Sequence, residues 1–130
     1  VTLSFYPDVD ALVAKHADAL LSGGRNAERS AFILGALRRR TALPALQVAL
    51  KSDNAALRKV GAWAVGFIAS EDGVELLKPY TEDPNATVRA EVALALGRIG
   101  DRTTLDTLED MLGDANPSVV TRAHSSINRL

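Results

Sequence analysis

A spacing of 31 residues relates most of this 130-residue chain to itself, and it limits the possible folds more than any other feature. Gly35, Gly66 and Gly97 occupy one column of the repeat. The apolar positions of three segments coincide at the same offset without a gap: Leu57, Gly61, Ala64, Val65 and Ile68; Val88, Val92, Ala95, Leu96 and Ile99; Val119, Ala123, Ser126, Ile127 and Leu130. Such a period is typical of a solenoid, in which each unit buries its apolar face against its neighbours.

The segment 83–114 shows what one unit contains. Its apolar positions between 88 and 99 recur with the period of a helix, about 3.6 residues per turn. The residues Asp83 to Asn85 supply start signals, and Gly100 ends this first helix. A second helix is predicted to start from Thr103 or Thr104 as its N-cap. Its inward positions are expected to be Leu105, Leu108, Met111 and Leu112.

The repeat predicts one domain over residues 1–130. The expected parts are an N-terminal strap and capping helix (1–25), three helical hairpins (26–53, 54–83 and 84–114), and a half repeat or cap (115–130). Pro79 is expected to kink or shorten the second helix of the middle hairpin, because proline removes a backbone hydrogen bond. The segment 1–7, with Leu3, Phe5 and Tyr6, is predicted to pack as a strap on the first helices.

The run TVRAEVALALGRIGD, residues 87–101, resembles the first helix of a HEAT-like repeat, of the short kind also found in phycobilisome (bilin) lyases. The resemblance covers residues 26–130. It implies an all-α fold, a right-handed superhelix of about three hairpins. In that arrangement the first helices lie outside and the second helices line an inner face.

The resemblance also implies a polar ladder between repeats. In this family an Asp that ends one repeat and an Arg six residues later form the ladder, and Asp83 with Arg89 fits that spacing. Arg58 occupies the same column as Arg89. Ser52 stands where the Asp before Arg58 would be, and Val120 stands where the Arg after Asp114 would be. The ladder is therefore expected to be incomplete.

The residues offer little for catalysis, which requires convergent nucleophiles, bases or metal ligands. The two histidines, His16 and His124, lie at opposite ends of the repeat, and the chain contains no cysteine and no glycine-rich phosphate loop. We therefore expect no catalytic, cofactor or metal site, and no enzyme activity. Because no signal peptide or membrane-spanning run is visible, we expect a cytoplasmic location without membrane association.

Charged and polar side chains are predicted to line the inner face. They project from the second helices, on the side away from the apolar stripe: Gln47, Lys51, Glu75, Lys78, Glu82, Asp106, Glu109 and Asp110. Solenoids commonly bind ligands along such a surface. A basic or peptide-like partner is one interpretation, and an ordinary solvated surface is the other.

The charge is unevenly distributed along the chain. Residues 1–65 hold nine Lys or Arg against five acids, a net +4, and residues 66–130 hold six against eleven, a net −5. The residues Arg25, Arg29 and Arg38–Arg40 cluster in the first half and could contact nucleic acid or phosphate. However, Arg38–Arg40 follow a helix C-terminus, where positive charge is favourable, no aromatic stacking platform is evident beside the cluster, and the acidic second half would repel a polyanion. The pattern argues against nucleic acid as the partner.

One column that is normally polar in this family is apolar here. Phe32, Trp63 and Leu94 occupy it, and Val60 and Phe67 lie on the same helix face as Trp63. Together they predict an outer apolar patch that binds a partner or mediates self-association. The alternative is that the strap, or packing between first helices, covers the patch.

These observations favour a protein-interaction module or scaffold. An apolar patch near Trp63 would supply affinity and charge along the inner helices would supply selectivity. The alternative is a helper of the bilin-lyase or chaperone kind that holds a tetrapyrrole and its acceptor protein. Nucleic-acid binding is the third hypothesis.

Overall fold

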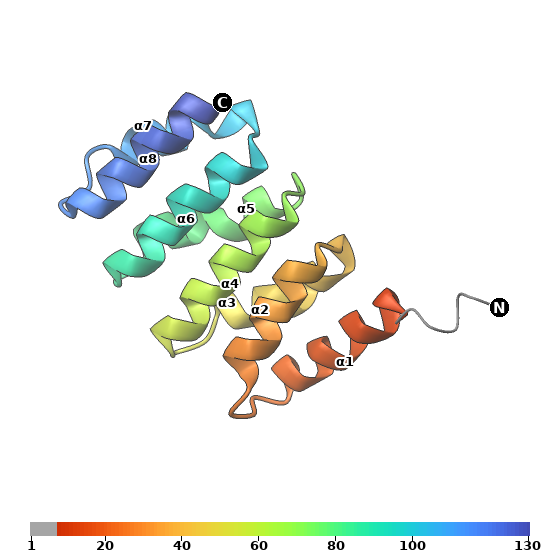
Figure 1. Ribbon diagram of the computed structural model, residues 1–130. Helices are drawn as coiled ribbons and strands as arrows, with labels where there is room; N and C mark the ends of the chain where they lie inside the picture. The colour runs from red at the N-terminus through yellow and green to blue at the C-terminus, as the bar shows by residue number, and fades with distance from the viewer. Residues whose placement is uncertain (1–7) are drawn as a thin grey trace.

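The computed structural model describes residues 8–130, and this part of the chain contains helices and turns but no strand (Figure 1). Its α-helices are α1 (Val9–Leu21), α2 (Ala27–Leu37), α3 (Leu43–Leu50), α4 (Ala55–Ile68), α5 (Gly73–Leu77), α6 (Ala86–Ile99), α7 (Leu105–Met111) and α8 (Pro117–Arg129). Three 3₁₀ turns precede or extend the second helices: η2 (Arg40–Ala42), η3 (Lys78–Glu82) and η4 (Arg102–Thr104). The predicted strap, residues 1–7, lies outside the described residues.

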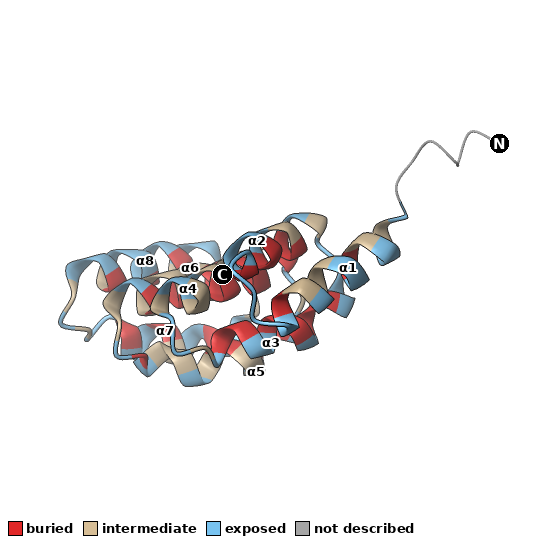
Figure 2. Cartoon of the chain, turned by 90° about the horizontal axis from the view of Figure 1, so that it is seen from below, coloured by how far each residue is buried: buried red, intermediate tan, exposed pale blue. Residues whose placement is uncertain are grey.

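The helices form two layers. The first helices of the hairpins, α2, α4, α6 and α8, lie side by side in one layer, and α3, α5 and α7 lie in the other (Figure 2). Helix α1 packs at the N-terminal end of the stack, against α2 and α3. The fully buried residues Leu46, Val65 and Leu96 belong to the core between the layers. The predicted all-α, right-handed superhelical fold is confirmed.

The repeat columns explain where the first helices begin and end. Asn54, Asn85 and Asn116 are the N-caps of α4, α6 and α8, and each side-chain oxygen accepts a backbone N–H of the first turn. The helices α2, α4 and α6 end on residues with left-handed backbone, at positions 38, 69 and 100. Only Gly100 adopts this conformation without steric strain.

The glycine column brings the outer helices unusually close together. A methyl group added to Gly66 would lie 2.5 Å from the side chain of Ala95 and 2.6 Å from its Cα atom. The same addition at Gly97 would lie 2.2 Å from Ser126 Oγ, which donates a 2.7 Å hydrogen bond to the carbonyl of Ala93. Each glycine therefore lets the backbone of the next helix approach.

The second helices are shorter and less regular. Helix α5 ends at Leu77 and continues as the 3₁₀ turn η3, which contains Pro79, so the proline shortens the helix as predicted. Thr104, one of the two predicted N-caps, is the N-cap residue of α7, but its side chain makes no capping hydrogen bond. Asp101 caps the preceding turn η4, where its carboxylate accepts the backbone N–H of Thr103.

For α7, two of the four residues expected to point inward do not do so. Leu108 and Met111 are buried, but Leu105 is 39% exposed and Leu112 is 37% exposed. Leu43 and Val74 occupy the same repeat column as Leu105, and they are only 6% and 4% exposed. Helix α7 is the last second helix of the described chain, so no further second helix covers its open side.

Candidate protein-interaction site

Two arginine–aspartate pairs connect successive repeats. Arg58 Nε and Nη2 donate to the two carboxylate oxygens of Asp83, at 2.8 and 3.0 Å. Arg89 Nε and Nη2 contact Asp114 in the same way, at 2.7 and 3.1 Å. Each arginine therefore forms a bidentate pair with the aspartate 25 residues later, the strongest geometry available to these groups.

The pairing differs from the one implied by the family resemblance. Arg89 does contact Asp83, six residues earlier, but its Nη1 donates to the backbone carbonyl, at 2.8 Å. Arg58 makes the equivalent bond to the carbonyl of Ser52. A backbone carbonyl is present whatever the side chain, so Ser52 leaves this bond intact. Val120 occupies the arginine column but has no charged group to form a pair. Within residues 8–130 the ladder therefore consists of the pairs Arg58–Asp83 and Arg89–Asp114.

The pairs change the titration of their members in the expected directions. The hydrogen bond to Arg89 lowers the pKa of the Asp114 carboxyl, and burial opposes this effect. The hydrogen bonds to Asp83 and Asp114 raise the pKa of Arg58 and Arg89 respectively. All of these shifts favour the charged forms. The ladder thus fixes the repeats relative to one another and is not a reactive group.

The residues predicted for the inner face lie on α3, α5 and α7 or on the caps and turns that adjoin these helices. Most are exposed: Gln47, Lys51, Glu75, Glu82, Asp106, Glu109 and Asp110. Lys78 is half-buried, and its Nζ lies 2.9 Å from the carboxylate of Glu75. Among residues 8–130, no ion pair involves the other four acids, Glu82, Asp106, Glu109 and Asp110. The second half of the inner face therefore carries uncompensated negative charge.

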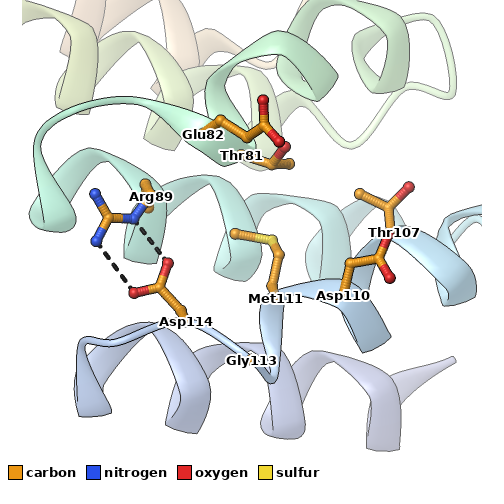
Figure 3. Close-up of a pocket in the computed structure, with 8 residues that line it drawn as sticks. All are labelled: Thr81, Glu82, Arg89, Thr107, Asp110, Met111, Gly113 and Asp114. Atoms are coloured by element: carbon orange, nitrogen blue, oxygen red, sulfur yellow. Dashed lines mark hydrogen bonds and ion pairs between the residues drawn. The ribbon is translucent and has the colours of Figure 1, made fainter.

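A cavity of about 390 Å³ opens on this acidic part of the inner face (Figure 3). Glu82 approaches it from η3, and Asp110 and Met111 approach it from α7. The Arg89–Asp114 pair closes one side. Both carboxylates are exposed, whereas Met111 is only 5% exposed. The cavity thus combines a partly apolar lining with unpaired negative charge.

The outer patch consists of stacked aromatic rings. The rings of Phe32 and Trp63 lie parallel, with centroids 4.7 Å apart and planes at 2°. Phe67 also stacks on Trp63, with centroids 4.9 Å apart. Phe32 is 53% exposed, whereas Val60, Trp63, Phe67 and Leu94 are half-buried. Lateral packing between first helices thus covers the patch in part.

Two arginines complete this surface, and the repeat columns did not indicate them. The guanidinium carbons of Arg38 and Arg98 lie 5.4 and 5.7 Å from the centroid of the Phe67 ring. Arg98 follows Leu94 by one helical turn, so the outer-face spacing could have indicated it. Arg38 reaches the ring from the left-handed cap of α2. The expectation that no aromatic platform accompanies the Arg38–Arg40 cluster is wrong for Arg38.

The two histidines, the remaining candidates for catalysis or metal binding, do not lie together. His16 is half-buried on α1 and His124 is exposed on α8. Within residues 8–130, no group of three or more His, Cys, Asp or Glu residues is arranged to hold a metal ion. No helix in this range is both long enough and apolar enough to cross a lipid bilayer.

Comparison with known proteins agrees with the architecture. A curated relative from Pseudanabaena tenuis (strain PCC 7409), an uncharacterized phycocyanin operon protein Z, is 30% identical over 120 residues. The aligned part is 85% of this chain and 59% of the relative, so the chain spans less than two thirds of that protein.

Solved structures share the fold at lower identity. Human deoxyhypusine hydroxylase, in complex with glycerol, matches with a TM-score of 0.81 at 23% identity, over 93% of this chain and 44% of the enzyme chain. The complex of CpcE and CpcF of phycocyanin lyase from Nostoc sp. PCC7120 matches with a TM-score of 0.76 at 22% identity, over 94% of this chain and 52% of the other. The model of HEAT repeats matches residues 44–128. The chain belongs to the HEAT-repeat family.

Proposed function

We propose that this chain is a protein-interaction scaffold without catalytic activity of its own, and that its inner face binds a basic segment of a partner protein. The observation that carries the proposal is the cavity between Glu82 and Asp110. Both carboxylates are exposed and lack a cation within the described chain, and the ladder beside them holds the repeats in register. A Lys or Arg side chain from a partner would supply the missing positive charge.

The geometry also suggests how such a segment is selected. The apolar stem of a Lys or Arg side chain can pack on Met111, while its charged end lies between the carboxylates. Asp106 and Glu109 extend the negative charge along α7. Complementary charge across an interface contributes mainly to association rate and selectivity, so binding should weaken as salt increases.

The proposal is tested with fluorescently labelled peptides rich in Lys and Arg, and with peptides of the same length in which Glu replaces the basic residues. Anisotropy at low and at physiological ionic strength should show binding of the basic peptides alone. The double variant Glu82→Gln, Asp110→Asn should weaken binding by about tenfold or more, which corresponds to about 1.4 kcal/mol. The control Glu28→Gln removes an exposed acid from α2, away from the inner face, and should preserve binding.

Failure of every basic peptide to bind at low ionic strength would reject the inner-face hypothesis. Equal binding to the double variant and the wild type would also reject it, because the cavity would then have no role. Trp63, the only tryptophan, lies on α4. Its fluorescence emission shows whether the variants fold alike.

A second candidate function is a bilin-lyase-like or chaperone-like helper that holds a tetrapyrrole and its acceptor protein. It is favoured by the relative described as a phycocyanin operon protein and by the fold shared with phycocyanin lyase. Titration with a linear tetrapyrrole should then change the visible absorbance of the pigment and quench Trp63 fluorescence. Absence of both responses would remove this candidate.

A further inference from the structure

We propose that the outer aromatic–arginine stack, formed by Phe32, Trp63 and Phe67 with Arg38 and Arg98, binds an acidic segment of a partner protein through one apolar anchor residue. The stack lies on α2, α4 and α6, in the opposite layer from the inner face. It is therefore a second docking surface, and its charge preference is the reverse of that proposed for the inner face.

The stack leaves one aromatic face for a partner. Trp63 stacks with both Phe32 and Phe67, and the arginines lie over Phe67. Phe32 uses one face to stack on Trp63 and is 53% exposed. A cavity of about 140 Å³ adjoins these rings, lined by Phe32, Lys59, Val60, Trp63 and Glu91. This volume suits one apolar side chain of a protein partner.

The charges around the rings indicate that the partner is acidic. Neither Arg38, Arg98 nor Lys59 takes part in an ion pair among residues 8–130. Arg98 is also the residue with a buried donor, Nη1, that contacts no hydrogen-bond acceptor. Glu91 is the single acid that lines the cavity. The guanidinium groups lie over Phe67 and not in the cavity beside Phe32, so carboxylates a few residues along the segment from the anchor would meet them, and Lys59 would meet a carboxylate beside the anchor.

The same geometry disfavours single-stranded nucleic acid, which shares the preference for aromatic rings and positive charge. Successive bases bind by stacking on open ring faces. Here Trp63 already stacks with two other rings and Phe67 is covered by Trp63 and the arginines, so Phe32, which is 53% exposed, is the ring most available to a base. One open face and one small cavity fit a single anchor side chain better than a row of bases.

The experiment uses the intact chain and a panel of peptides in which Asp or Glu residues flank a Leu or Phe anchor. A second panel keeps the anchor but replaces the acids with Lys. Binding is measured by anisotropy and by the emission of Trp63, the only tryptophan. The acidic panel should bind and change the Trp63 emission. Phe32→Ala and Arg98→Gln should each weaken binding about tenfold, whereas Arg129→Gln, on the exposed end of α8, should change it less than about twofold.

Each alternative occupant gives its own result. Equal binding of the Lys panel would overturn the proposal, since the arginines would then have no role. Competition by single-stranded DNA that is stronger than that of the acidic peptides would assign the surface to nucleic acid instead. A dimer in light scattering that Phe32→Ala converts to monomer would assign it to a second copy of the chain. The double variant Glu82→Gln, Asp110→Asn changes only the inner face, so it should not alter any of these results. The two proposals can therefore be rejected independently of each other.

Discussion

At the scale of single residues, the glycine column sets the distance between neighbouring outer helices. Gly35, Gly66 and Gly97 face the backbone of Ala64, Ala95 and Ser126 respectively, and no side chain fits at any of the three positions. Glycine is otherwise unfavourable in a helix by about 1 kcal/mol relative to alanine. Its presence at three equivalent positions therefore reflects close packing and not helix formation.

Gly66→Ala should destabilise the chain, because the new methyl group would overlap both the side chain and the Cα atom of Ala95. Overpacking of about 1 to 3 kcal/mol exceeds the gain in helix propensity. Because helix propensity offsets about 1 kcal/mol of this cost, urea unfolding should show a net loss of up to about 2 kcal/mol. Adding Ala95→Gly should restore only part of this loss, since the overlap with the backbone at position 95 remains. Gly24→Ala is the control, because nothing lies within 4 Å of its added methyl group.

Asp114→Asn should reduce stability at neutral pH by about 1.5 to 3 kcal/mol, since it removes the charged acceptor of Arg89. Pairing lowers the pKa of Asp114 in the folded state. Its contribution is therefore complete above the unfolded pKa, about 3.9, and is lost as the pH falls through the lower folded value.

The measurement is the difference in free energy of unfolding between wild type and Asp114→Asn across the acid range. The difference should shrink below about pH 4. Asp106→Asn, which removes an exposed acid without an ion pair, should show a smaller effect. A constant difference at every pH would mean that the ion pair is not its source.

At the scale of elements, the sequence predicts the first helices better than the second. Asn54, Asn85 and Asn116 mark their starts, and a 14-residue helix repeats its apolar stripe enough times to be recognised. The second helices are as short as five residues and merge with 3₁₀ turns, so their ends depend on local capping. Asp101, for example, caps the turn η4, and the side chain of Thr104 makes no capping hydrogen bond to α7.

The surfaces were predictable only in part, for a related reason. A 31-residue column places Phe32 beside Trp63, and their rings do stack. The same columns identify Asp83, Arg58 and Arg89 but do not say which carboxylate each arginine contacts. That choice depends on the lateral distance between repeats. The position of Arg38 depends on its left-handed backbone conformation at the end of α2. The sequence does not indicate this conformation, because residue 38 is not a glycine.

The open side of α7 gives an element-level prediction. Leu43→Ala should cost about 2 to 5 kcal/mol, because Leu43 is 6% exposed on α3. Leu105→Ala removes the same atoms from the equivalent position of α7, but Leu105 is 39% exposed, so the loss should be smaller than that of Leu43→Ala by about 1 kcal/mol or more. Urea unfolding of the matched pair tests the difference. Equal losses would show that α7 is covered in solution, for example by a second copy.

At the scale of the whole molecule, a solenoid has no single centre, and each repeat is stabilised by its neighbours. Helix α4 is packed between α2 and α6 and buries six residues, including Val65 and Ile68. Helix α1 lies at the end of the stack and buries only Val13 and Leu20, while Leu21 is 54% exposed. The N-terminal end should therefore open more easily than the middle.

Hydrogen exchange should detect this gradient. Amides of α1 should exchange through an opening of lower free energy than those of α4 and α6, because opening α1 exposes little apolar surface. Val13→Ala and Val65→Ala are a matched pair, since both remove the same atoms from buried sites, 5% and 0% exposed. Val13→Ala should accelerate exchange in α1 alone, whereas Val65→Ala should accelerate it in α4 and the helices packed on it and leave α1 unchanged. If Val13→Ala accelerated exchange equally in α4 and α6, the described chain would unfold as one unit and not repeat by repeat.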